Sequence, residues 1–108
     1  MDAKTTKWLE DHPNEARALS TFTEQMAHEL MANSAKGSRE DWIRRGARDG
    51  INELHWHAAK LSVAVKDLEY GEHADVVEEA VQEFAADVAV CALMVADSSG
   101  VLSITEDA

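Results

Sequence analysis

The chain has 108 residues and a formal net charge of −11, and 45% of its residues are hydrophobic. This length predicts one domain with a modest core. The charge argues against direct binding of nucleic acid, because affinity for a phosphate backbone comes mainly from Lys and Arg. The single cysteine, Cys91, excludes an intramolecular disulfide and is expected to be a packed, inert thiol.

The sequence also argues against contact with a membrane. Residues 1–4 do not begin the apolar core of a secretory signal peptide. The longest apolar run, residues 84–96, is too short and too interrupted to cross a bilayer. Together with the single cysteine, these features predict a cytoplasmic protein. The acidic surface has two interpretations, plain solubility or a docking face that mimics nucleic acid.

The first predicted helix begins at Pro13, because proline suits the first helical turn. It runs to about Asn33. Residues 1–12 are predicted to be flexible or peripheral. The apolar residues of this helix recur at helical spacing, at Leu19, Phe22, Met26 and Leu30.

A loop and a short helix follow. Residues 33–37 have the composition of a helix stop and a loop. Ser38 is expected to cap the next helix, with Asp41 three residues later in place of the usual glutamate. This short helix contains Trp42.

Two longer helices predict an antiparallel hairpin, over about residues 51–69 and 74–98. Gly71 lies between them, and Gly100 stands where a C-terminal cap is expected. Their apolar residues recur in steps of three and four, which is the pattern of a seam between helices. The seam residues are Ile51, Leu54, Ala58, Leu61, Val65 and Leu68 on the first helix, and Val77, Val81, Phe84, Val88, Cys91 and Val95 on the second.

No segment shows the clean alternation of a half-buried strand. The sequence therefore predicts an all-α helical bundle, a single domain over residues 1–108 that is built on the hairpin. The last helix has more apolar surface than one neighbour can cover, so either the helix that begins at Pro13 or a second copy of the chain is needed to cover it. We expect the bundle to be completed by dimerisation through this last helix. Residues 101–108 are predicted to be flexible or peripheral.

Asp87 is the most unusual acid of the sequence. It is the only polar residue between Phe84 and Ala96, a stretch that a helix would bury on most sides. A carboxylate in such a place is normally paired or bound to a ligand. Glu83 precedes it by four residues and therefore shares its face of the helix.

The other helix of the hairpin carries a matching set. Glu53 and His57 are four residues apart, and Lys60 follows at the next turn. In an antiparallel hairpin these side chains would face Glu83 and Asp87. Carboxylates on neighbouring helices bind hard divalent cations, and a histidine shifts the preference toward manganese and similar metals. The pattern therefore predicts a Mg²⁺ or Mn²⁺ site made by Asp87, Glu83, His57 and Glu53.

A purely structural interpretation of the same residues stays open. Lys60 would then neutralise Glu83 or Asp87 across the hairpin as an ion pair, and Glu53 with His57 would be a surface pair. An ammonium group beside a metal ion is unfavourable because the two positive charges repel. Both interpretations place the same side chains close together.

The segment from Lys36 to Arg39 is a second candidate for binding. It combines two cations with the backbone amides of Gly37 and Ser38, directly before Trp42. Such a loop can bind phosphate, although a lone basic loop is also common without a ligand. Lys36 and Trp42 are therefore candidate substrate-binding residues.

Two short motifs lie near the end of the last predicted helix, at residues 83–89 and 93–97. An upstream set keeps a fixed order along the chain: Met26, Leu30, Asn33, Lys36, Gly37 and Trp42. Together these motifs resemble the small phage and prokaryotic members of the MazG-like nucleotide pyrophosphohydrolases, over roughly residues 22–100.

This resemblance implies an all-α fold and a dimer or tetramer. It implies hydrolysis of a nucleoside triphosphate to the monophosphate and pyrophosphate. It also implies magnesium held by four acids, two glutamates three apart on one helix and a glutamate and an aspartate three apart on the next, which activates the attacking water.

The chain departs from that motif at three of the four acids. His57 and Lys60 stand where the two glutamates belong, and Phe84 stands where the third acid belongs. Asp87 alone matches directly. Phenylalanine cannot bind a metal, so standard two-magnesium chemistry would require a rebuilt site. Glu83, Glu53 and His57 are the residues available to rebuild it.

Two functional hypotheses follow. In the first, the chain binds a nucleotide or a related phosphate compound and hydrolyses it around one divalent cation. Asp87 and Glu83 would then be catalytic, and Lys60 would contact phosphate. In the second, the chain is a catalytically inactive relative, an acidic interaction or regulatory protein of phage type that its charge steers to a basic partner. The combination of Lys60 and Phe84 favours the second hypothesis.

Overall fold

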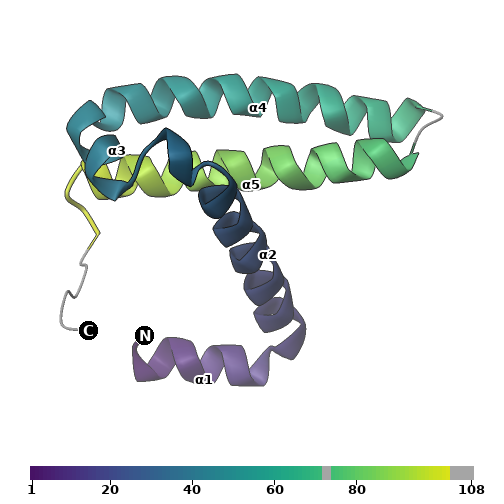
Figure 1. The fold of residues 1–108 in the computed structure, drawn as a ribbon. Helices are drawn as coiled ribbons and strands as arrows, with labels where there is room; N and C mark the ends of the chain where they lie inside the picture. Colours follow the sequence, from purple (N-terminus) through teal and green to yellow (C-terminus); the bar gives the residue numbers. More distant parts are fainter. Residues whose placement is uncertain (72–73, 103–108) are drawn as a thin grey trace.

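The computed structural model describes residues 1–71 and 74–102, which form helices and connecting turns (Figure 1). No strand occurs among these residues, so the predicted all-α class is confirmed. The elements are α1 Ala3–Asp11, α2 Pro13–Ala32, the 3₁₀ turn η1 Ser34–Lys36, α3 Arg39–Arg45, α4 Ala47–Tyr70 and α5 Ala74–Ser98.

The predicted hairpin is the frame of the molecule. Helices α4 and α5 run antiparallel along their length, α2 crosses α5, and α3 packs at the end of the hairpin away from its turn (Figure 1). Helix α4 begins four residues before the predicted start. Gly46, with a φ of 87°, separates α3 from α4, and the chain re-enters helical geometry at Ala47.

Helices α4 and α5 pack tightly beside Gly50. A Cβ atom at Gly50 would lie 2.9 Å from Cγ2 of Val95, and 3.7 Å from the backbone nitrogen of the same residue. A glycine inside a helix lowers its stability relative to alanine. Here the missing side chain allows close packing of the two helices.

The predicted ends of the other helices agree with the structure. The Ser38 backbone N–H donates to Oδ2 of Asp41 at 2.7 Å, which is one half of the expected capping box at α3. Gly100 has a φ of 74°, and the Val101 N–H donates to the Ala96 carbonyl at 3.3 Å. This is the glycine-based C-terminal cap expected for α5. Residues 103–108 of the predicted tail lie outside the described residues.

Helix α1 was not predicted, although its position is peripheral. Asp2 caps it by accepting from the Thr5 N–H at 2.7 Å. The Trp8 ring stacks on His12 with a centroid separation of 3.9 Å, where α1 gives way to α2. Among the described elements, α1 packs on α2 alone. The two helices therefore project as an arm from the hairpin.

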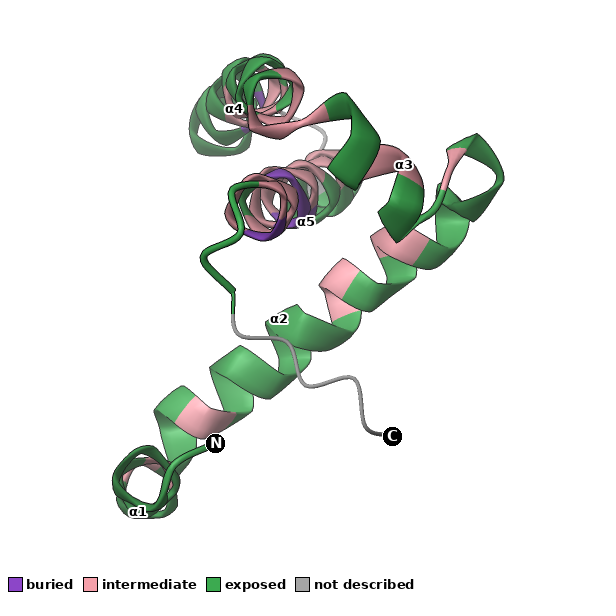
Figure 2. Cartoon of the chain, turned by 90° about the vertical axis from the view of Figure 1, so that its left-hand side faces the viewer, coloured by how far each residue is buried: buried purple, intermediate pink, exposed green. Residues whose placement is uncertain are grey.

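The core is shallow and consists of small side chains (Figure 2). Several outer seam residues remain partly exposed, including Ile51, Val65 and Leu68. None of the described helices is long and apolar enough to cross a membrane. The buried hydrophobic residues are Ala64, Ala86, Val90 and Cys91.

One buried acid attaches α3 to the hairpin. Asp97, with 8% of its surface exposed, accepts hydrogen bonds from Nε and Nη2 of Arg39 at 2.7 and 2.8 Å. The indole N–H of Trp42 donates to the same carboxylate at 3.0 Å. The hydrogen bonds from Arg39 and then from Trp42 hold the pKa of Asp97 below its usual value. This contact fixes α3 and the loop before it over one end of α5.

Candidate functional site

A cavity of about 470 Å³ lies where α2, the η1–α3 segment, α4 and α5 meet. Acidic side chains line the cavity where α2 crosses α5, and lysine and arginine side chains also line it. The seven residues predicted from the sequence as catalytic, metal-binding or substrate-binding all line it: Asp87, Glu83, Lys60, Lys36, Trp42, His57 and Glu53.

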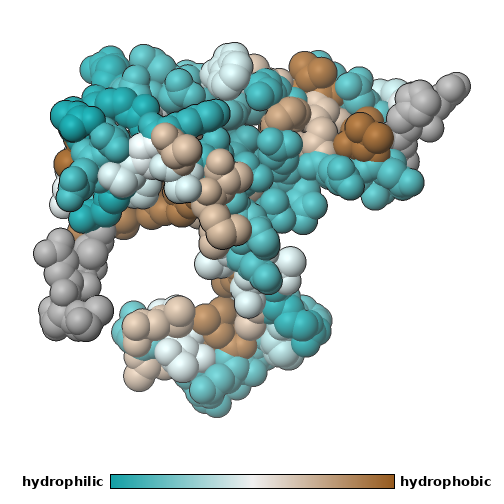
Figure 3. Space-filling view, viewed as in Figure 1, coloured by the Kyte–Doolittle hydropathy of each residue, from teal (hydrophilic) through white to brown (hydrophobic). Residues whose placement is uncertain are grey.

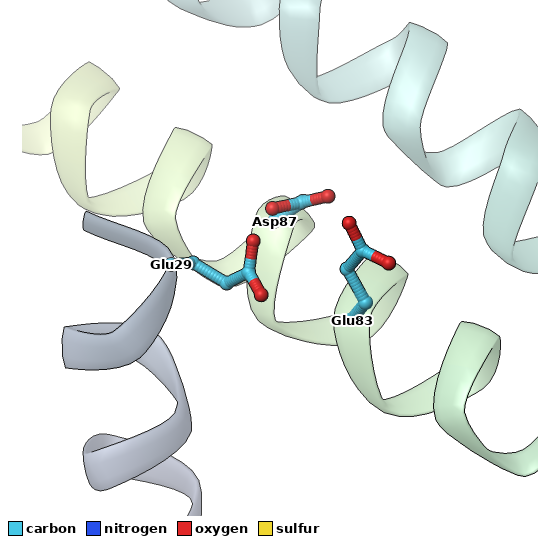
Figure 4. Close-up of side chains that lie close together, drawn as sticks. All are labelled: Glu29, Glu83 and Asp87. Atoms are coloured by element: carbon cyan, nitrogen blue, oxygen red, sulfur yellow. The ribbon is translucent and has the colours of Figure 1, made fainter. Parts of the chain in front are cut away.

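Three carboxylates converge in this cavity (Figure 4). Glu83 and Asp87 come from successive turns of α5, and Glu29 reaches them from α2. One oxygen of each residue lies within 4.8 Å of the others. The sequence analysis did not identify Glu29. The sequence feature that could have identified Glu29 is its position on the apolar face of α2, beside Met26 and Leu30.

The three carboxylates repel one another. Burial is the main factor that raises the pKa of Glu29, from 4.5 to about 7, followed by the hydrogen bond and charge of Asp87 and the charge of Glu83. Among the described residues, none of the three acids forms an ion pair with lysine or arginine. The cluster therefore has no lysine or arginine partner among the described residues, and the ionisable group beside it is His57, whose Nδ1 atom lies 3.6 Å from Oδ2 of Asp87.

His57 lies between two acids without belonging to the cluster. Its Nδ1 atom is 3.6 Å from Oδ2 of Asp87, and its Nε2 atom is 3.8 Å from Oε2 of Glu53. The Nδ1 atom is buried and has no hydrogen-bond partner among the described residues. Glu53 is more than half exposed. The structure thus places His57 and Glu53 beside the cluster, while Glu83 and Asp87 form it with Glu29.

Lys60 does not form the ion pair that the structural alternative requires. Its Nζ atom lies over the rings of Trp56 and Phe84, 4.4 and 4.5 Å from their centroids. The negative faces of aromatic rings attract an ammonium group, so Phe84 holds the lysine away from the acids. The expected neutralisation of Glu83 or Asp87 by Lys60 is therefore corrected for the described part of the chain.

The rim of the cavity carries the remaining candidates. Lys36 stands at the end of η1, and Trp42 stands on α3. The indole N–H of Trp42 is engaged by Asp97, so only the ring can contact a ligand. Arg45 also lines the cavity and was missed by the sequence analysis; its Nε atom lies 3.7 Å from Oδ2 of Asp49.

Cys91 borders the same cavity but is not a nucleophile. Burial raises the pKa of its thiol to about 11, and the charges of Glu53 and Asp87 add to the effect. Such a thiol is almost entirely protonated near neutral pH. The expected packing of this cysteine is confirmed by its burial.

The arrangement can bind a hard cation and an anion side by side. Three carboxylate oxygens suit Mg²⁺ or Mn²⁺, and the cations of Lys36, Arg45 and Lys60 suit phosphate groups. Comparison of the chain with protein-family models, with curated proteins and with solved structures finds no match. The chemistry of the cavity is therefore the basis for assigning a function.

Proposed function

We propose that the chain is a MazG-like nucleoside triphosphate pyrophosphohydrolase that acts in the cytoplasm as a homodimer. The observation that carries the proposal is the convergence of Glu29, Glu83 and Asp87 in a cavity that also contains cations, with no lysine or arginine among the described residues paired to any of the three. A cavity lined by both acids and cations matches a substrate that carries phosphates and a divalent metal.

The donor set fits Mg²⁺ or Mn²⁺. All three ligands would be carboxylate oxygens, which these ions prefer. Burial, followed by the hydrogen bond and charge of Asp87 and the charge of Glu83, raises the pKa of Glu29, and a bound cation would stabilise its ionised form. When bound, such an ion makes a coordinated water more acidic and neutralises phosphate charge. Glu29 also offers the carboxylate that the MazG-like motif loses at Phe84.

The chain's own groups would position the nucleotide. Lys36 and Lys60 would bind the phosphates, and the rings of Trp56 and Phe84 hold the Lys60 ammonium group in place. Trp42 would cover one end of the cavity and exclude water there. The products would be a nucleoside monophosphate and pyrophosphate, with the elements of one water added across the bond between the α and β phosphates.

His57 has a separate role in this proposal. Its Nδ1 atom faces Oδ2 of Asp87 without a hydrogen bond. A small movement would let Nδ1 donate to that oxygen and fix the orientation of Asp87. Glu83 and Asp87 remain the proposed catalytic acids, with Glu29 as a further ligand.

Pyrophosphate release from the common nucleoside triphosphates, with Mg²⁺ and with Mn²⁺, tests the proposal. We expect release that falls on the order of 100-fold or more in Asp87→Asn and in Glu29→Gln, because each change removes a metal ligand. Glu24→Gln is the matched control, since Glu24 is an exposed acid of the same helix as Glu29. It should retain the wild-type rate.

A parallel measurement reports binding without turnover. Mg²⁺ or Mn²⁺ should raise the melting temperature of the wild type and of Glu24→Gln, but not of Asp87→Asn. If no nucleotide is hydrolysed and no cation shifts the melting temperature, the pyrophosphohydrolase assignment is wrong. The acidic interaction or regulatory protein would then be the better account.

A further inference from the structure

Lys60 lies at a boundary between polar and apolar parts of the hairpin. It lines the acidic cavity, and it also lines an apolar groove of about 390 Å³ between α4 and α5. Figure 3 shows hydrophobic side chains gathered over these two helices in the half of the hairpin nearer its turn. The described lining of the groove contains one other charged residue, Asp67. The Lys60 ammonium group can therefore contact either carboxylates on one side or aromatic rings on the other.

The antiparallel register brings Lys60 to the level of the acids. Nδ1 of His57 lies 3.6 Å from Oδ2 of Asp87, which fixes one point of contact between α4 and α5. Three residues further along each helix, in opposite directions, Nζ of Lys60 lies 4.5 Å from the centroid of the Phe84 ring. Glu83 is the neighbour of Phe84 and lines the cavity together with Lys60. Charge and register alone would therefore favour an ion pair between Lys60 and Glu83.

Two aromatic rings take the place of that ion pair. Trp56 precedes Lys60 by four residues and therefore lies on the same face of α4, and the centroid of its ring is 4.4 Å from Nζ of the lysine. The Phe84 ring faces the same ammonium group from α5. Lys60 forms no ion pair within the described part of the chain. Because water screens an exposed ion pair, two rings can compete with Glu83, the exposed acid of the cluster.

We propose that Trp56 and Phe84 are positioning residues that hold the Lys60 ammonium group out of the acidic cluster. The inference rests on the proposed function and deepens it, because it identifies what keeps the cluster open to a divalent cation. A lysine that moved onto Glu83 and Asp87 would occupy carboxylate oxygens that the cation needs, and its charge would repel the cation. Lys60 is thus a competitor for the metal site that belongs to the chain itself. The two rings determine the affinity for metal through this lysine.

Binding of Mn²⁺ to the full chain without nucleotide tests the proposal, measured by isothermal titration calorimetry. Phe84→Leu keeps an apolar side chain and removes the ring. We expect it to weaken Mn²⁺ binding about 10-fold, which corresponds to a lysine that occupies the cluster about nine-tenths of the time. The conservative variant Phe84→Tyr keeps the ring and should bind Mn²⁺ like the wild type.

Removing the lysine distinguishes this role from a general loss of packing. The double variant Phe84→Leu with Lys60→Met should regain the wild-type affinity for Mn²⁺, because no ammonium group is left to compete. Lys60→Met alone should bind Mn²⁺ at least as tightly as the wild type. Val81→Ala is the matched control, since Val81 is a half-buried residue one turn before Phe84 that lines neither the cavity nor the groove. It should leave the affinity unchanged.

A double-mutant cycle in EDTA tests the position of Lys60 without any metal. The free energies of unfolding of Lys60→Met, Glu83→Gln and the double variant give the coupling between these two side chains. We expect a coupling near zero in the wild-type background, and a stabilising coupling once Phe84→Leu is added. Equal coupling in both backgrounds, or Phe84→Leu with the wild-type affinity for Mn²⁺, would overturn the proposal. If the wild type binds no Mn²⁺ while the cycle gives the expected result, the proposed function is wrong and the rings still position Lys60.

Discussion

Helix α5 carries two acids in opposite circumstances. Asp97, near its C-terminal end, accepts three hydrogen bonds from Arg39 and Trp42, and its pKa is lowered. Asp87, near the middle, faces Glu29 and Glu83, and the pKa of Glu29 is raised to about 7. Arg39 and Trp42 compensate the charge of Asp97. Asp87 belongs to a cluster that has no lysine or arginine partner among the described residues.

The difference in their partners distinguishes an acid that stabilises the fold, Asp97, from an acid that is available to bind a ligand, Asp87. A buried carboxylate that is fully paired stabilises the fold and has little capacity left for a ligand. A group of unpaired carboxylates destabilises the fold in the absence of a cation. Binding of a cation removes this destabilisation, and this is why such a group favours cation binding. Burial alone would rank Asp97 first as a site, whereas its partners show that it is a structural contact.

Removing the compensated acid should have the largest effect on stability. Asp97→Ala leaves the Arg39 guanidinium and the Trp42 indole N–H without this acceptor. We expect it to lower the melting temperature more than any other single substitution named here, and to change the tryptophan fluorescence. Asp97→Asn keeps one acceptor oxygen and should lie between Asp97→Ala and the wild type.

Glu79→Ala is the control for that experiment, because Glu79 is an exposed acid of the same helix. Its melting temperature should remain near the wild-type value. An Asp97→Ala protein as stable as Glu79→Ala would show that the contact between α3 and α5 is incidental.

Substitution in the acidic cluster should have an intermediate effect on stability, and the size of this effect should depend on pH. Glu29 has a pKa of 4.5 when unfolded and about 7 in the metal-free fold, so the folded state binds more protons between these values. Stability therefore falls as pH rises from 4.5 to about 7, and the loss is complete above that range. Glu29→Gln should remove this fall and be the more stable protein at pH 8.

Denaturant unfolding in EDTA across this range measures the effect, with Glu24→Gln as the control that keeps the wild-type slope. Below pH 4.5 the Glu29→Gln and wild-type curves should meet. Parallel curves at every pH would mean that neither burial nor the two neighbouring carboxylates raise the pKa of Glu29.

The charges of the acids should have their smallest effect at Cys91, because burial is the main cause of its raised pKa. Raising the thiol pKa from 9.0 to about 11 reduces the thiolate fraction at pH 8 roughly 100-fold. Iodoacetamide labelling followed by mass spectrometry should be slower than that of a free cysteine by about this factor. Added Mg²⁺ should change it little, because burial is the main cause of the shift. Labelling at the rate of a free thiol would contradict the burial of Cys91.

Local features were predictable because neighbouring residues determine them. The hairpin, its turn at Gly71, the Ser38 and Asp41 cap and the Gly100 cap follow from spacing and from special residues. The spacing of Glu83 and Asp87 also placed both on one side of α5. Helix α1 was missed because it is short, contains only three apolar residues, Ala3, Trp8 and Leu9, and is followed by a proline.

Contacts between distant elements were not predictable in the same way. Glu29 meets Glu83 only because α2 crosses α5 at that height, and no periodicity in the sequence specifies a crossing point. The attachment of Arg39 to Asp97 joins segments 58 positions apart. Lys60 was assigned to the acids by charge alone, whereas the rings beside it offer a closer partner.

The close approach at Gly50 has a mechanical consequence. The helix continues from Gly50 to His57 over about 10 Å, at 1.5 Å per residue. Because a helix is stiff over that length, a change in the contact between Gly50 and Val95 would also shift the more distant part of α4 relative to α5. A methyl group at position 50 would tilt α4 away from α5 and widen the gap between His57 and Asp87. Gly50, which itself lines the cavity, therefore also sets the distance between two side chains further along it.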